Sequence, residues 1–75
     1  MKELLLFIVQ RLTQMPDAVS VSEFQDGDTD VLKLVVAEAD KGKVIGKEGK
    51  VIKAIRSVVG VAASKAGKKV AVEID

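Results

Sequence analysis

The sequence predicts an α+β domain of two layers, in which helices cover one face of a three-stranded sheet. The first observation is the hydrophobic pattern, which follows the order helix, strand, strand, helix, helix, strand. The second is size, because 75 residues suit one domain spanning 1–75, and no linker or internal repeat interrupts it. The third is composition, because 48% apolar residues are too many for a disordered chain. Helices segregated from strands in this way favour a two-layer arrangement.

The chain opens with a predicted helix over residues 2–14. Pro16 ends it, because proline disfavours helical backbone in the residue before it. The face expected to enter the core carries Leu4, Leu5, Ile8 and Leu12, widened by Leu6, Phe7 and Val9. Lys2 and Arg11 are too few bases for a helix that lies on a membrane surface. The apolar run is too short to span a bilayer and no cleavage site follows it, so we expect a cytoplasmic protein without a membrane partner.

Two strands and a turn come next. Residues 18–25 alternate as a strand does, except that Phe24 breaks the pattern and indicates a bulge or a strand end near Glu23. The turn carries three acids spaced two apart, Asp26, Asp28 and Asp30. Their spacing resembles a calcium loop, but the glycine and the distal glutamate of such a loop are missing, which favours a plain hairpin. Residues 31–38 are apolar on both faces, as central strands usually are.

The second half predicts a short helix, a glycine turn, a long helix and a last strand. Asp40 is a suitable N-cap for the short helix over 41–45, which Gly46 ends. The long helix runs from about 49 to 66, and Gly67 follows as its C′ residue. Its predicted core face carries Ile52, Ile55, Val59, Ala62, Ala63 and Ala66. In the last strand, over 69–74, the inward residues are Val70, Val72 and Ile74.

Charge and reactive side chains narrow the function classes. The chain has no histidine and no cysteine, so the usual metal ligands, nucleophiles and acid–base residues are missing, and we expect no enzyme, cofactor or metal. The net charge of +1 is unevenly distributed. Residues 41–69 hold nine lysines and arginines against Glu48 alone, a net of +8, and the remainder of the chain sums to −7. A basic block of this kind is typical of a polyanion-binding surface.

The basic block coincides with a glycine turn, Gly46-Lys47-Glu48-Gly49, between two helices. Glycine lets another molecule approach the backbone closely, and the helix that follows offers free N–H groups and the positive end of its dipole. Lysines surround this anion site, so phosphate is the expected anion. A Walker P-loop fails on spacing and on Glu48, which stands where magnesium needs a hydroxyl, and a Rossmann fingerprint also fails on spacing. A plain linker between helices needs neither the paired glycines nor the bases.

Residues Val44 to Ile52, VIGKEGKVI, resemble the V-I-G-x-x-G-x-x-I signature of the KH domain. With the order of elements, the whole chain resembles the small bacterial RNA-binding proteins of the KhpA family. The resemblance implies a type II KH fold with a mixed sheet, and a GXXG loop that clamps about four nucleotides of a single strand. It also implies homodimers, or heterodimers with a larger KH-containing bacterial protein, and an RNA chaperone role linked to cell elongation and division.

The expected RNA-binding residues are Lys43, Val44, Ile45, Gly46, Lys47, Glu48, Gly49, Lys50 and Lys53. The backbone of the loop would hold phosphate, the lysines would add charge, and the aliphatic side chains would carry the bases. Val44 and Ile45 are equally compatible with plain core, and core is also the expected role of Ile52. Loops of the family often carry basic or neutral residues between the glycines, and Glu48 departs from that pattern. Its charge offsets Lys47 and is expected to weaken phosphate binding, although a carboxylate there favours the helix N-terminus. We therefore expect low sequence specificity and no small-molecule substrate.

The long helix carries a second apolar stripe beside its core face, formed by Val51, Ala54, Val58 and Val61. Either the first helix packs against this stripe or the stripe is exposed and forms a homodimer interface. The alternative to RNA binding is accordingly a protein-interaction module that keeps the KH scaffold without binding RNA.

Overall fold

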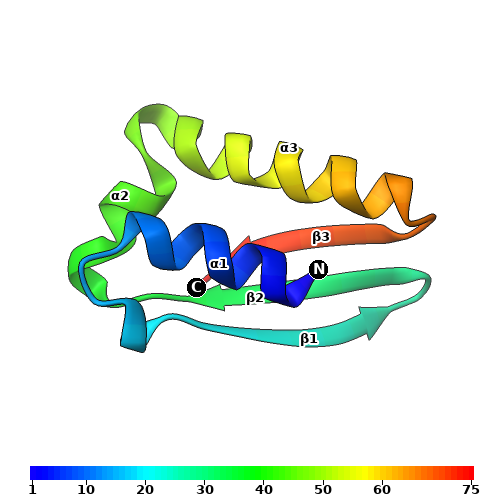
Figure 1. Cartoon of the computed structure of the whole chain (residues 1–75), viewed down its shortest axis with the longest axis horizontal. Helices are drawn as coiled ribbons and strands as arrows, with labels where there is room; N and C mark the ends of the chain where they lie inside the picture. The colour runs from blue at the N-terminus through cyan, green and yellow to red at the C-terminus, as the bar shows by residue number, and fades with distance from the viewer.

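The computed structural model describes all 75 residues. The helices are α1 (Lys2–Leu12), α2 (Lys41–Ile45) and α3 (Lys50–Lys65), and the strands are β1 (Ser20–Asp26), β2 (Thr29–Val35) and β3 (Lys69–Ile74). Short 3-10 turns at Pro16–Ala18, Glu38–Asp40 and Lys47–Gly49 connect them. The helices lie on one face of the sheet (Figure 1). The predicted two-layer α+β class and the order of elements are therefore confirmed.

The sheet is mixed, with β2 at its centre as predicted. β1 pairs with β2 in the antiparallel sense through a two-residue turn, and β3 pairs with the other side of β2 in the parallel sense. A parallel pair needs a crossover, and here α2 and α3 supply it. This crossover places the glycine turn at one end of the molecule and the β1–β2 hairpin at the other (Figure 1).

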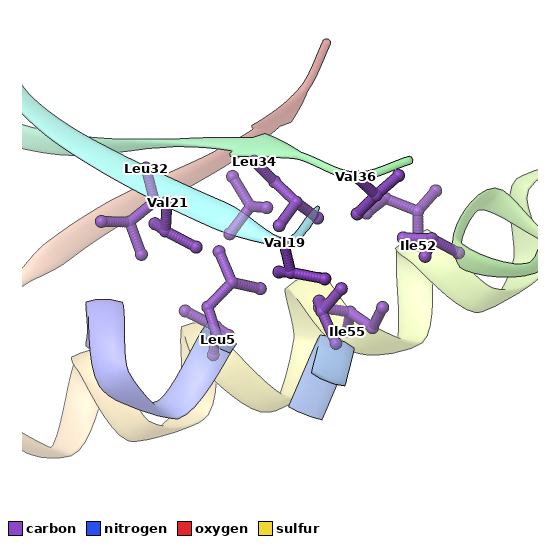
Figure 2. Close-up of a cluster of buried hydrophobic side chains, with 12 residues drawn as sticks. Leu5, Val19, Val21, Leu32, Leu34, Val36, Ile52 and Ile55 are labelled. Carbon is purple, nitrogen blue, oxygen red and sulfur yellow. The ribbon is translucent and has the colours of Figure 1, made fainter. Parts of the chain in front are cut away.

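The core lies between the sheet and the helices. Leu5 of α1 and Ile55 of α3 point toward Leu34 of the central strand (Figure 2). The buried cluster comprises Leu5, Val9, Val19, Val21, Leu32, Leu34, Val36, Val44, Ile52, Ile55, Val59 and Val72. Val70 and Ile74 pack against its border, so the inward face predicted for the last strand is confirmed.

The predicted irregularity near Phe24 is wrong. β1 continues to Asp26 in unbroken register, with Glu23 opposite Leu32 and Phe24 opposite Val31. Successive strand residues point to opposite faces, so Phe24 lies with Val31 on the face without helices. Val31 is 5% exposed, whereas Phe24 is half-exposed beside it. The alternation looked broken because an exposed glutamate occupies the helix side of β1 while an aromatic residue covers the opposite side.

The first helix is shorter and less buried than predicted. It ends at Leu12, because Thr13 is extended with φ −103° and ψ 151°. Of its apolar residues, Leu5 and Val9 are buried, whereas Phe7 is 55% and Leu12 is 40% exposed. A helix on a sheet buries one stripe, and Phe7 lies outside that stripe. Its ring lies 4.3 Å from the Arg11 guanidinium, a cation–π contact.

The far end of α3 has the predicted glycine cap. Gly67 has a φ of 71°, its N–H donates to Ser64 O at 3.0 Å, and Lys68 N–H donates to Ala63 O at 2.9 Å. These are the two bonds of a Schellman motif, which turns the chain into β3. Of the predicted core face of α3, Ala66 is exposed, because it lies at this end of the helix. None of the helices has both the length and the apolar character needed to cross a bilayer.

Candidate nucleic-acid interface

The glycine loop reverses the chain between α2 and α3 with three residues in left-handed backbone. Gly46 has φ 78° and ψ 172°, Glu48 has φ 58° and ψ 24°, and Gly49 has φ 74° and ψ 17°. Gly49 N–H donates to Gly46 O at 3.1 Å and closes the turn. The side chains of Lys47 and Glu48 are both exposed. The loop therefore presents backbone and charge to solvent.

Gly46 is the loop position at which no other residue type fits. A Cβ placed on Gly46 would lie 2.8 Å from the backbone nitrogen of Val51, a separation that real side chains do not show. Its positive φ would strain any other residue as well. A Cβ on Gly49 would make ordinary contacts, with Ile52 Cγ2 at 3.9 Å. Close packing of Gly46 on the first turn of α3 thus fixes the loop against the helix.

The loop leads directly into the N-terminus of α3, which no side chain caps. Gly49 occupies the N-cap position, and the first turn contains no acid. The first N–H groups of a helix have no partners within the helix and carry the positive end of its dipole. The sixteen-residue α3 therefore offers an open anion site beside the loop.

Four lysines that the sequence assigned to the site lie around this N-terminus. Lys43 belongs to α2, Lys47 to the loop, and Lys50 and Lys53 to the first turns of α3. All four side chains are exposed. The ion pairs of the molecule join Lys41 to Glu38 and Lys69 to Asp28, so none of the four is neutralised by a carboxylate partner. Their charge remains available to a ligand.

The aliphatic members of the predicted site are mainly core. Val44 is fully buried and Ile52 is 5% exposed, so neither side chain offers a surface to a nucleobase. Ile45 is half-buried and packs at the border of the core. Of the two roles that the sequence left open, Val44 therefore takes the core role, and it anchors α2 beneath the loop.

Arg56 is a candidate that sequence reasoning missed. Its Nε donates to Val72 O at 3.1 Å, which joins α3 to β3. Arg56 follows Lys53 by three residues, so both lie on one flank of α3. The helical spacing of the two bases was a usable signal, but the contact with the strand carbonyl was not visible in the sequence. Arg56 extends the basic surface from the glycine loop along β3.

The second apolar stripe of α3 is largely exposed. Val51 is half-buried and packs against the core, whereas Ala54 is exposed, Val58 is 52% exposed and Val61 is 59% exposed. α1 contacts α3 on the same side of the sheet, but the exposure of Ala54, Val58 and Val61 shows that α1 does not cover them. The alternative in which the first helix covers the whole stripe is therefore wrong.

The hairpin end of the molecule has a different chemistry. A surface hollow of about 450 Å³ is lined by Gln25, Asp28, Asp30, Gly67, Lys68 and Lys69. Asp28 pairs with Lys69 at 3.3 Å, and Asp30 accepts a hydrogen bond from Gln25. Charges of both signs compensate each other there, and no three potential metal ligands come together anywhere in the chain. The hollow is therefore a poorer anion site than the glycine loop.

The α-β-β-α-α-β order, the parallel β2–β3 pair and the glycine loop between α2 and α3 define a type II KH domain. The chain belongs to the KhpA/KhpB KH-domain family, whose model matches residues 2–74. This is a family of KH domains and not of enzymes.

Sequence relatives match over almost the entire chain. RNA-binding protein KhpA of Clostridium acetobutylicum is 50% identical over 74 residues, which cover 99% of both chains. RNA-binding protein KhpA of Chlamydia trachomatis is 46% identical over 74 residues, 99% of this chain and 95% of the relative.

Solved structures share the fold at low identity. Era from Aquifex aeolicus bound to GDP and aluminium fluoride matches 97% of this chain with a TM-score of 0.67 and 22% identity. A complex of Era with MgGDPNP and nucleotides 1506–1542 of 16S ribosomal RNA matches 97% with a TM-score of 0.61 and 23% identity. In both cases the match spans 28% of the Era chain.

Proposed function

We propose that this protein binds single-stranded RNA without catalysis, through the glycine loop and the N-terminus of α3. The carrying observation is the coincidence of four exposed, unpaired lysines with an uncapped helix N-terminus and a loop in left-handed backbone. Relatives at 46–50% identity are named RNA-binding proteins, which supports RNA as the ligand. Membership of the family also supports an RNA chaperone role in bacterial cell elongation or division.

The contacts on offer favour weak sequence discrimination. Backbone N–H groups and lysines hold phosphate, and phosphate contacts position a strand without reading its bases. The chain has no tryptophan or tyrosine, and Phe7 and Phe24 lie outside the basic block. Stacking platforms of the kind that read unpaired bases are therefore scarce. Arg56 is the group on this surface best suited to a planar, two-bond contact with a base or phosphate.

The double variant Lys47→Asp/Glu48→Asp tests the proposal. Both side chains are exposed, so the fold should persist. The loop loses the positive charge of Lys47, and binding of a mixed single-stranded RNA should therefore fall below detection in a polarisation assay. Lys68→Asp is the matched control, because it makes the same change of −2 in charge beyond the other end of α3. Unchanged RNA affinity of the double variant would remove the loop from the site. Loss of helical circular dichroism would show that the loop is structural.

A second function is favoured by the exposed residues of α3. Ala54, Val58 and Val61 form an apolar strip on a chain too small to bury much core, and such strips mark interfaces. We propose that this strip pairs with a second KH domain, either another copy of this chain or a larger bacterial KH protein. If mixed RNA does not bind at low salt, pairing through this strip becomes the primary function.

A further inference from the structure

Asp40 is the one charged residue among the buried residues of the molecule. It is 1% exposed and lies immediately before α2, the short helix that ends in the glycine loop. One carboxylate oxygen accepts the backbone N–H of Gln14 at 3.1 Å, and the other accepts the backbone N–H of Met15 at 3.0 Å. The carboxylate therefore joins two segments that are 25 and 26 residues apart in the sequence.

The predicted N-cap position of Asp40 at α2 is confirmed, but its side chain makes no capping hydrogen bond to that helix. It has no cationic partner either, because the neighbouring Lys41 pairs with Glu38. Burying a carboxylate opposes folding unless its oxygens are hydrogen-bonded, and here both oxygens are used to hold the connection between α1 and β1.

α2 packs against α3 and α1, and its beginning is tied to the chain that follows α1. Its five residues form too short a helix to be stable alone. Val44 anchors it from within the core, and Asp40 anchors its beginning through the two amides. Gly46 follows directly, with its N–H bonded to Gly42 O at 2.8 Å. Any shift of α2 is therefore passed to the first residue of the loop. Figure 1 shows α2 beside the C-terminal end of α1, where this link forms.

We propose that Asp40 is a positioning residue for the glycine loop, and that its link to Gln14 and Met15 holds the loop in the geometry that binds phosphate. The inference rests on the proposed RNA-binding function, because it concerns the affinity of the same site. Asp40 itself is buried and touches no ligand. It acts through α2, which carries the loop.

The test compares Asp40→Asn with a variant that weakens the core elsewhere. In Asp40→Asn the amide can accept one N–H, but its NH2 group faces the second N–H and cannot bond it. We expect RNA affinity to fall about tenfold at a temperature where the variant is fully folded. Val9→Ala is the control, because Val9 is fully buried in α1. This substitution should lower the melting temperature while leaving the RNA affinity of the folded molecules unchanged.

Two readouts separate positioning from plain stability. If Asp40→Asn melts earlier but binds RNA like the wild type, Asp40 is only structural and the inference is wrong. If the wild type fails to bind RNA, the proposed function is wrong, and amide exchange still tests the link. Exchange at Gly46–Gly49 should then be faster in Asp40→Asn than in Val9→Ala, and equal rates would overturn the inference.

A wild-type measurement covers the case in which Asp40→Asn does not fold. If the link and RNA binding support each other, RNA must stabilise the link by the same free energy. Hydrogen exchange at the Gln14 and Met15 amides should therefore slow when a single-stranded RNA is added. Unchanged exchange rates at saturating RNA would contradict the positioning role.

Discussion

Glu48 has φ 58° and ψ 24°, a left-handed backbone that costs an L-residue about 1–2 kcal/mol. Its carboxylate stands before the N-terminus of α3, where a negative charge is worth roughly 0.3–1 kcal/mol to the helix. The same charge lies where we place the phosphate of the RNA. Glu48 thus favours the N-terminus of α3 through its charge, strains the loop through its backbone, and opposes the phosphate of the proposed ligand.

We therefore expect Glu48→Asn to tighten RNA binding about fivefold with little change in stability. Asparagine tolerates the left-handed region, and the substitution removes a repulsion worth roughly 1 kcal/mol at about 4 Å in water. Polarisation titrations would measure the affinity, and thermal unfolding would measure the stability. Glu3→Gln is the control, because Glu3 is an exposed acid in the first turn of α1. Equal affinities for Glu48→Asn and the wild type would mean that the carboxylate does not face the RNA.

At the scale of elements, α3 has three different flanks. Its core flank packs on the sheet, and its third flank exposes Val58 and Val61. Its basic flank carries Lys53 beside the glycine loop and Arg56, which bonds β3. Gly60 adds no side chain to the surface, and a Cβ there would meet no atom within 4 Å. One helix can therefore serve RNA and a partner chain on separate sides.

Val58→Glu tests the partner flank. If two copies pair through this flank, a charge at its centre should be buried without a partner, and the variant should run as a folded monomer by light scattering. Ser22→Glu is the control, because Ser22 is exposed on the sheet face without helices, and the same change in charge there should leave the assembly unchanged. A wild type that remains monomeric at high concentration would contradict the proposed interface. So would a Val58→Glu variant whose assembly has the same mass as the wild type by light scattering.

The sequence predicted the elements well because their patterns are local. Alternation identified the strands, helical spacing identified α3, and Gly67 marked its end, since each signal lies within a few residues. The missed features depend on partners distant in the sequence. The Asp40 side chain bonds amides 25 and 26 residues away, and Arg56 bonds a carbonyl 16 residues away. Contacts between residues so far apart in the sequence leave no periodic pattern from which they could be predicted.

The candidate site was predicted in part for the same reason. The loop and its four lysines lie within one short segment, residues 43–53, so their proximity can be seen in the sequence. Val44 was ambiguous because a buried aliphatic residue and the floor of a binding groove look identical in a sequence. Phe7 was expected to widen the core face, but α1 buries a single stripe through Leu5 and Val9, and Phe7 lies outside it.

At the scale of the whole molecule, unbalanced positive charge is concentrated at one end of the long axis. The loop end carries Lys43, Lys47, Lys50 and Lys53, whereas at the hairpin end Asp26, Asp28 and Asp30 are balanced by Lys65, Lys68 and Lys69. The molecule extends 34 Å in its longest dimension, more than three Debye lengths at about 0.1 M salt. The two ends therefore act on a ligand almost independently.

Salt dependence follows from this arrangement. If the loop end neutralises two to four phosphates, the slope of log K against log salt for a single strand should be about −1.5 to −3. Titrations at several salt concentrations would measure it. A flat dependence would show that the basic block is not the binding surface, and a much steeper slope would require a longer footprint than one loop.

The uneven distribution of positive charge also bears on how the molecule would approach RNA. A polyanion is attracted more strongly to the loop end than to the hairpin end, where charges of both signs compensate each other. We therefore expect an approaching molecule to be oriented before contact, so that more of its encounters are productive. Stopped-flow association should therefore slow with added salt more than dissociation accelerates. Under the proposed function, one copy of the chain would bind RNA at its loop end alone. Bridging two RNA strands would then require an assembly in which two loops face outward.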